Sequence, residues 1–272
     1  MSVRSRPKIM GILNVTPDSF SDGGQFGDLD AAVRQARRLI DEGADILDIG
    51  GESTRPGAAI VPVSEELSRV VPVIQAIRTA TLDDDPGPVI SVDTRKPEVA
   101  EAAILAGADI WNDVSALTYS EDSLRLAADL GCPVILMHAQ GTPETMQDRP
   151  DYDDPVDEVL NYLRTRIEAC EAAGIERDQV TIDPGIGFGK RLSDNLAILR
   201  HTARFAALAP TLIGTSRKSF IQKIDGSPVD KRLPGSLASA LFAACNGAAV
   251  LRVHDVAETL QAFRVWESIE HD

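Results

Sequence analysis

Carboxylate and amide side chains recur in this 272-residue sequence at the ends of apolar, Ile- and Val-rich runs. One run ends at Asp93 in "PVISVD", another near Asn112 in "ADIWND", and a third at Asp183 in "QVTIDPG". A carboxylate accepts hydrogen bonds, and a carboxamide both donates and accepts them. Together these three side chains could bind the amino, lactam and ring-nitrogen edges of a flat heterocycle such as a pterin or a purine.

Basic side chains follow the last two apolar runs, in "TSRK" and "LRVH". They are Arg217, Lys218, Arg252 and His254. The planar guanidinium of arginine suits a phosphate group, although each of these residues alone could be an ordinary surface cation. Asn14 ends the first apolar run and offers a neutral oxygen to a Mg²⁺ ion held mainly by phosphate and water. The pattern predicts a site for a polar heterocycle next to a phosphate group.

A structural role is the alternative for every one of these residues, because helix N-caps and turns use the same residue types. That explanation weakens when polar residues end all the apolar runs. Burying a whole row of amides and carboxylates is costly unless each group is satisfied. Side chains that converge on one ligand site explain the row better.

The elements that must position these residues alternate between strand and helix. Eight strands are expected, each followed by helical periodicity, over residues 8–15, 45–51, 88–93, 108–113, 133–138, 179–185, 210–214 and 249–255. This order predicts an α/β fold, a (β/α)8 TIM barrel with its site at the C-terminal face of the strands. No linker interrupts residues 1–272, so we expect a single barrel domain.

Composition restricts the partners and the compartment. The formal net charge is −15, which disfavours nucleic acid and anionic membranes as partners, and no run is long enough to span a membrane. The apolar "IMGILNV" is too short for a signal peptide and is interpreted as a strand. The cysteines Cys132, Cys170 and Cys245 have no metal or redox spacing, so we expect a reducing, cytoplasmic location.

The segment "DPGIGFGK" (residues 183–190) contains the glycines and lysine of a phosphate-binding loop but matches neither common nucleotide motif. Its glycines would let the chain turn close to a ligand. Lys190 has no assignable role from sequence, and the default expectation is a solvated lysine.

These residues also resemble the dihydropteroate synthase family of the folate pathway. The resemblance extends from Ile9 to about Glu267 and rests on the order and spacing of "GILNVTPDSFSDGG", "GGESTRPGA", "SVDTRKPEVA", "ND", "LMHAQGTPETMQ", "DPGIGFGK", "GTSRKSFI" and "LRVHDV". It implies condensation of 6-hydroxymethyl-7,8-dihydropterin pyrophosphate with p-aminobenzoate, giving dihydropteroate and pyrophosphate, with Mg²⁺. It further implies a homodimer and inhibition by sulfonamides.

The resemblance also implies roles for individual residues. The pterin pyrophosphate would contact Thr54, Asp93, Asn112, Asp183, Lys218, Arg252 and His254. The p-aminobenzoate pocket would be lined by Phe20, Arg55, Pro56, Phe188 and Ser219. Catalysis would depend on Asp22, Arg55, Lys218 and Arg252, and Asn14 would hold the metal.

Other functions are compatible with a pterin-binding barrel. A corrinoid-linked methyltetrahydrofolate methyltransferase shares the barrel but needs no pyrophosphate site. A barrel that binds pterin without catalysis would be expected to lose Asp22, Arg55, Lys218 or Arg252, which are all present. An enzyme acting on a phosphorylated sugar would need a Schiff-base lysine or a base at a strand end, and none lies inside a strand; this alternative rests on the fold alone.

Overall fold

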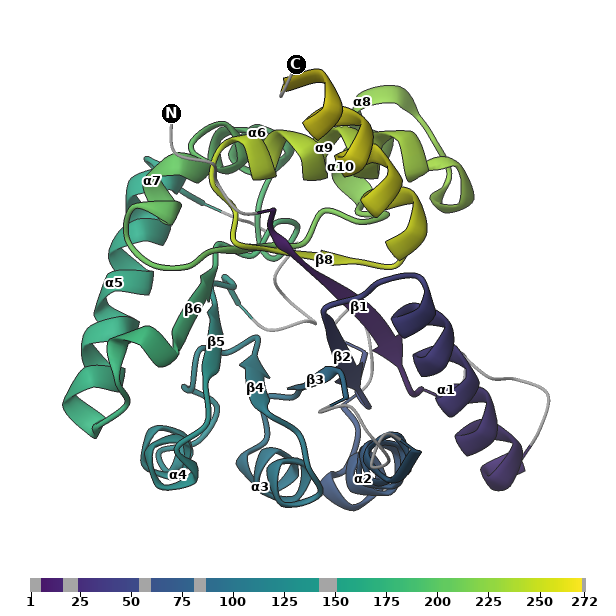
Figure 1. The fold of residues 1–272 in the computed structure, drawn as a ribbon. Coiled ribbons are helices and arrows are strands. Elements are labelled where there is room, and N and C mark those ends of the chain that lie inside the picture. The colour runs from purple at the N-terminus through teal and green to yellow at the C-terminus, as the bar shows by residue number, and fades with distance from the viewer. Residues whose placement is uncertain (1–5, 17–23, 54–59, 81–86, 142–150, 271–272) are drawn as a thin grey trace.

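The computed structural model describes residues 6–16, 24–53, 60–80, 87–141 and 151–270. Within them, eight parallel strands form one sheet with helices around its outside (Figure 1). The strands are β1 (Lys8–Asn14), β2 (Ile46–Gly50), β3 (Val89–Asp93), β4 (Ile110–Asp113), β5 (Val134–Met137), β6 (Val180–Asp183), β7 (Leu212–Ile213) and β8 (Val250–Val253). Neighbours follow the order β6-β5-β4-β3-β2-β1-β8-β7.

Helices connect successive strands and cover the outside of the sheet (Figure 1). They are α1 (Gly24–Asp41), α2 (Val63–Ala80), α3 (Pro97–Leu105), α4 (Ser123–Leu130), α5 (Pro155–Ala173), α6 (Leu192–Arg200), α7 (Thr202–Ala206), α8 (Ser219–Asp225), α9 (Leu233–Cys245) and α10 (Val256–Glu270), with short 3-10 turns η2 (Arg177–Gln179) and η3 (Val229–Lys231). Local chemistry sets their ends. The side chain of Asp154 accepts hydrogen bonds from the backbone N–H groups of Val156 and Asp157 at the start of α5, and Gly174, with a φ of 96°, caps its C-terminal end.

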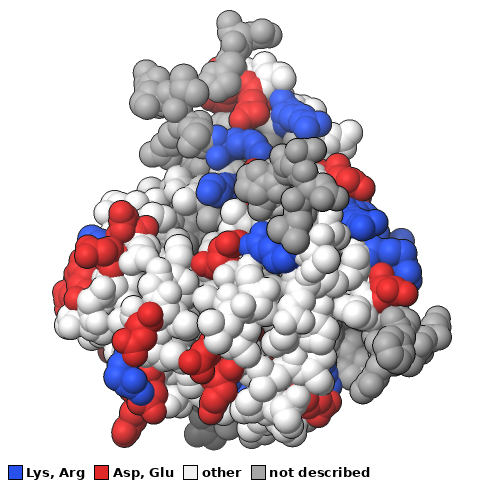
Figure 2. Space-filling model, turned by 60° about the horizontal axis from the view of Figure 1, so that its bottom comes forward, with Lys and Arg blue, Asp and Glu red and all other residues white. Residues whose placement is uncertain are grey.

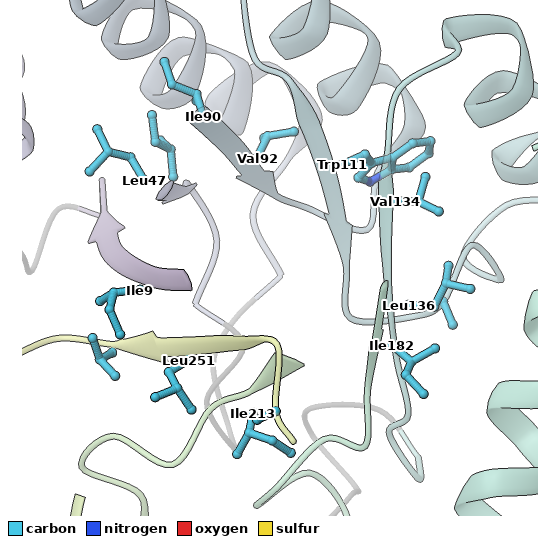
Figure 3. Packing of buried hydrophobic residues seen from close by; sticks show 14 of the residues in the cluster. Ile9, Leu47, Ile90, Val92, Trp111, Val134, Leu136, Ile182, Ile213 and Leu251 are labelled. Atoms are coloured by element: carbon cyan, nitrogen blue, oxygen red, sulfur yellow. The ribbon is translucent and has the colours of Figure 1, made fainter. Parts of the chain in front are cut away.

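Strand side chains alternate between two apolar layers, as a period of two requires. The outward layer packs against the helices and includes Ile9, Leu47, Ile90, Val92, Trp111, Val134, Leu136, Ile182, Ile213 and Leu251 (Figure 3). A second, separate cluster contains Met10, Ile46, Ile135, Leu212 and Val250. Because these residues have the opposite parity on their strands, they fill the inside of the barrel, as layered side chains do in this fold.

The barrel closes between β6 and β7, where pairing is sparse. Only Leu212 and Ile213 form β7, and both pair with β8. Toward β6 there is an isolated bridge between Ile182 and Thr211, and the Ile182 N–H donates to the Pro210 carbonyl at 2.9 Å. By contrast, β1 and β2 pair over five residues, from Met10 to Asn14 on the β1 side.

The predicted (β/α)8 barrel is confirmed, and the carboxyl ends of its strands converge at one face. Across the described ranges, no helix combines the length and apolar character needed to cross a bilayer. On the face drawn in Figure 2, acidic and basic side chains form several small groups that alternate with uncharged surface. That residues 1–272 form one domain stays a prediction.

Candidate active site

A layer of polar side chains lies inside the barrel, between the inner apolar cluster that contains Met10 and Ile46 and the carboxyl ends of the strands. Residues two positions apart on a strand face the same side, so Asp48 shares the inward face with Ile46, and Arg252 shares it with Val250. The register sets Asp93 beside Gly50 on one side and beside Asn112 on the other. Strand pairing therefore sets Asp93 and Asn112 side by side, and side-chain contacts join Asp48 and Arg252 to them.

Arg252 is the centre of this layer. Its Nε donates to Asp48 Oδ2 at 2.6 Å, and its Nη2 donates to Asp93 Oδ2 at 2.7 Å. The amide of Asn112 lies 3.3 Å from both carboxylate oxygens of Asp48. Asp48 is completely buried, and Asp93 and Asn112 are nearly so. Buried charges are tolerated when they are paired in this way, because the partner compensates the lost hydration.

Two polar atoms in this layer are left over among the described residues: one oxygen of Asp93, and Oγ of Ser91, which pairs in register with Asp48. Asp93 Oδ1 is buried and has no hydrogen-bond partner among the residues that the structure describes. Burial raises the pKa of Asp93 to about 7, while the positive charge of Arg252 opposes that rise. An unpaired buried oxygen is costly, so a ligand N–H at this position would be favoured.

A second group of side chains lies where β6 and β7 lead into their loops. Asp183 ends β6, and its Oδ1 accepts the Gly185 N–H at 2.7 Å. Lys218 Nζ donates to the Ile186 carbonyl and lies 4.6 Å from the centre of the Phe188 ring. Burial raises the pKa of Asp183 and lowers that of Lys218 to about 8, and each shift is opposed by the charge of the other residue. The loop after β6 thus brings an acidic, a basic and an aromatic side chain together.

Backbone geometry explains why this loop needs glycine. Gly185 has a φ of 69°, and a Cβ atom built there would overlap the His138 carbonyl oxygen at the end of β5. Only glycine combines that φ with so close an approach. The loop is therefore packed tightly against the end of the neighbouring strand.

Two basic residues near β8 differ from each other in their surroundings. The ring Nδ1 of His254 lies 3.0 Å from Ser216 Oγ, which also accepts the backbone N–H of His254 at 3.2 Å. Arg217, which the sequence grouped with the phosphate-binding cations, instead pairs with Asp255, 3.1 Å from its Nε. Arg217 is therefore half-exposed and paired with Asp255, whereas Arg252 lies inside the barrel, beside Asp48 and Asp93.

Comparison with known proteins places this site in a family. A family model described as "Pterin binding enzyme" matches residues 10–254. The chain belongs to the pterin-binding enzymes. A dihydropteroate synthase of Escherichia coli K12 is 50% identical over 265 residues, covering 97% of this chain and 92% of that protein.

Solved structures of pterin-binding enzymes agree closely with this fold. The Xanthomonas albilineans dihydropteroate synthase with 4-aminobenzoic acid has a TM-score of 0.91 at 50% identity, covering 98% of this chain and 94% of that one. The Yersinia pestis dihydropteroate synthase with a sulfonamide drug complex has a TM-score of 0.90 at 45% identity, covering 98% and 95%. The Xanthomonas albilineans enzyme in complex with 7,8-dihydropteroate has a TM-score of 0.87 at 47% identity, again covering 98% and 95%.

The predicted site residues of this pterin-binding enzyme fall into two sets. Those within the described residues lie at the carboxyl ends of strands, in the loops just beyond or, for Ser219, at the start of α8, and they are Asn14, Asp93, Asn112, Asp183, Phe188, Lys218, Ser219, Arg252 and His254. The remaining predicted residues, Phe20, Asp22, Thr54, Arg55 and Pro56, lie outside the described residues.

The structure adds one residue and corrects another. Asp48 was missed because the sequence analysis took only the last positions of each strand, whereas Asp48 lies two residues before the end of β2. A charged residue in the middle of an otherwise apolar strand was the available signal. Lys190 was expected to be solvated, and that expectation is wrong, because its side chain is only 1% exposed.

Proposed function

We propose that this protein is a dihydropteroate synthase. It is a transferase that joins 6-hydroxymethyl-7,8-dihydropterin pyrophosphate to p-aminobenzoate, giving 7,8-dihydropteroate and pyrophosphate in folate biosynthesis. The observation that carries the proposal is 50% identity to a dihydropteroate synthase over 97% of the chain, together with a matching barrel. The polar layer at the mouth of the barrel supplies the chemistry that this reaction needs.

The pterin ring would bind within this layer. The unpaired Oδ1 of Asp93 and the carboxylate of Asp183 accept hydrogen bonds from ring N–H and amino groups. Asn112 and Lys218 supply donors for the lactam oxygen and the ring nitrogen. Because most of these groups are buried and already held by neighbours, they need little rearrangement to bind the ring.

The leaving pyrophosphate would be held by Arg252, His254 and Asn14. Arg252 uses its Nε and one Nη2 hydrogen on Asp48 and Asp93, so further N–H donors of the guanidinium remain for a phosphate oxygen. Asn14 ends β1 half-buried at the mouth, and its amide oxygen is a ligand of the type that Mg²⁺ accepts alongside phosphate and water. When bound, Mg²⁺ would neutralise charge on the pyrophosphate.

The reaction then needs no covalent attachment to the enzyme. The bond between the pterin CH₂ carbon and the pyrophosphate oxygen breaks, and its electron pair leaves with the pyrophosphate. The electron-rich ring stabilises the resulting carbocation, and the p-aminobenzoate nitrogen attacks that carbon and releases a proton. Arg252 and His254 stabilise the negative charge that develops on the leaving group, and the barrel aligns the two reactants.

The second substrate would bind next to the loop after β6. Phe188 and Ser219 belong to the described part of this pocket, with Phe20, Arg55 and Pro56 proposed from outside it. A sulfonamide would occupy the same pocket as p-aminobenzoate. We also propose a homodimer and a reducing, cytoplasmic setting, which suits the buried thiols Cys132 and Cys170.

The test is a turnover assay with purified protein, pterin pyrophosphate, p-aminobenzoate and Mg²⁺. We expect pyrophosphate and dihydropteroate in equal amounts, with no product when p-aminobenzoate is omitted and a large loss of rate when the metal is chelated. A methyltransferase or a non-catalytic pterin-binding barrel would release no pyrophosphate. That result would refute the proposed function, whereas activity that survives chelation would remove only the Mg²⁺ proposal.

A further inference from the structure

Lys190 is a buried cation that the proposed reaction does not use. It follows the loop after β6 and precedes α6, and its side chain is 1% exposed. Its Nζ lies 3.0 Å from His138 Nδ1, 3.3 Å from the His138 carbonyl and 3.0 Å from the Phe188 carbonyl. An ammonium group has three N–H donors, so each donor has one acceptor.

The surroundings of Lys190 differ from those of another buried lysine. Lys96 forms salt bridges with Glu52 and Glu66. No salt bridge involves Lys190 among the residues that the structure describes, and its direct partners are backbone carbonyls and an imidazole. Burial lowers the pKa of Lys190 to about 7, and the negative charge of Asp183 opposes that shift. Burial at this position therefore destabilises the charged form of the lysine. Such a cost is explained if the contacts of Lys190 serve the site.

Those contacts hold the loop from its inner side. The Phe188 carbonyl is bound to Lys190, and the Phe188 ring lies 4.6 Å from Lys218 Nζ. Lys218 binds the same loop at the Ile186 carbonyl. Lys190 therefore binds this loop at the Phe188 carbonyl, and Lys218 binds it two residues earlier while lying against the Phe188 ring.

The rest of the loop is also tied to fixed elements. The Gly187 N–H donates to Asn195 Oδ1 on α6 at 2.6 Å, and the Tyr152 hydroxyl donates to the Gly189 carbonyl at 2.9 Å. Neither of these contacts involves Phe188. Within the described part of the chain, Lys190 is the side chain that donates to the Phe188 backbone carbonyl.

We propose that Lys190 is a positioning residue for the second substrate: by binding the carbonyls of Phe188 and His138 together, it sets where the Phe188 ring lies in the p-aminobenzoate pocket. This inference rests on the proposed function, because it needs p-aminobenzoate to pack against that ring. Lys190 itself does not touch either substrate. Its loss should therefore affect the binding of p-aminobenzoate more than the binding of the pterin.

The experiment compares Lys190→Met, Phe188→Ala and the double variant in steady-state turnover. Lys190→Met keeps an unbranched side chain that is one atom shorter and removes all its donors. We expect the KM for p-aminobenzoate to rise about tenfold, since hydrogen bonds to a charged group are lost, and the KM for pterin pyrophosphate to change less than about threefold. In the Phe188→Ala background the same substitution should change the KM for p-aminobenzoate by less than about twofold, because the ring it positions is absent.

Two further variants separate positioning from general destabilisation. Arg166 is a matched control, because it also donates to loop carbonyls, those of Ala116 and Leu117, but after β4. Arg166→Met should lower the thermal unfolding temperature without a selective change in either KM. Lys190→Gln retains an amide donor, is expected to fold if Lys190→Met does not, and should give an intermediate KM for p-aminobenzoate.

The outcomes distinguish this inference from the proposed function. Equal rises in both KM values, or the same rise with and without Phe188, would overturn the role of Lys190 while leaving the proposed activity intact. A wild-type protein that releases no pyrophosphate would instead remove the proposed function and this inference with it.

Discussion

Replacing Arg252 by alanine removes the cation that connects Asp48 and Asp93 in the polar layer of the barrel. Two carboxylates depend on it, since Asp48 and Asp93 accept from Arg252 at 2.6 and 2.7 Å. The proposed function adds a third partner, the leaving pyrophosphate. The substitution should therefore have one effect on catalysis and a separate effect on folding.

The two effects have different magnitudes. A hydrogen bond between charged groups contributes about 1.5–3 kcal/mol. Loss of that contact to the transition state lowers kcat/KM for pterin pyrophosphate by about 13- to 160-fold. Breaking a buried ion pair costs about 3–5 kcal/mol of folding stability, because the remaining charge is left unpaired.

A second variant separates the two effects. In Asp48→Asn/Arg252→Ala, the fully buried carboxylate of Asp48 becomes neutral, so part of the stability should return. Activity should stay low, since the pyrophosphate contact is still missing. Denaturant unfolding measures stability and pyrophosphate release measures activity. Arg204→Ala, which breaks an exposed pair with Asp157, is the control and should change neither by much.

The reasoning fails if Arg252→Ala keeps kcat/KM within about threefold of wild type while remaining folded. Arg252 would then be a structural cation only. It also fails if the double variant recovers activity along with stability, because the lost activity would then have come from unpaired Asp48.

Three other predictions follow from the same geometry. Affinity for 6-hydroxymethylpterin, which carries no phosphate, should fall as the pH is lowered through about 7, because protonation of Asp93 removes an acceptor. Calorimetric titration at several pH values measures this affinity, and Asp93→Asn should lack the dependence. Gly185→Ala should unfold at lower denaturant concentration than Gly131→Ala, because both positions have positive φ but only Gly185 would meet the His138 carbonyl. A sulfonamide should inhibit competitively with p-aminobenzoate, and inhibition that excess p-aminobenzoate does not relieve would contradict the pocket at Phe188.

The fold followed from the sequence because its signals are local. Each expected strand is an apolar run whose two faces are both buried, and the structure has a strand within every one of them. The strand-end positions of Asp93, Asn112 and Asp183 followed equally directly, since a parallel barrel brings strand ends together. These inferences needed only the period of the pattern and the order of the elements.

The contacts within the site could not be predicted in that way. The pairing of Arg252 with Asp48 joins residues 204 positions apart, and it depends on which face of β2 turns inward. The burial of Lys190 depends on glycine turns and on the carbonyl of His138, just after β5 and 52 residues away in sequence. An isolated lysine after a glycine-rich loop carries no local signal of burial.

The sparse pairing between β6 and β7 has a thermodynamic consequence. Local opening of a sheet begins where few backbone hydrogen bonds must break, so we expect amide exchange in the ligand-free protein to be faster at this junction than at the other strand pairs of the barrel. Asp183 lies at the end of β6 and Lys218 lies just beyond β7, on the two sides of it. A pterin held by both residues would link the two sides. It would raise the ratio of closed to open barrel by a factor of one plus its concentration divided by its dissociation constant. Substrate binding should therefore slow exchange around Leu212 and Ile213, making the substrate a stabiliser of the barrel's weakest junction.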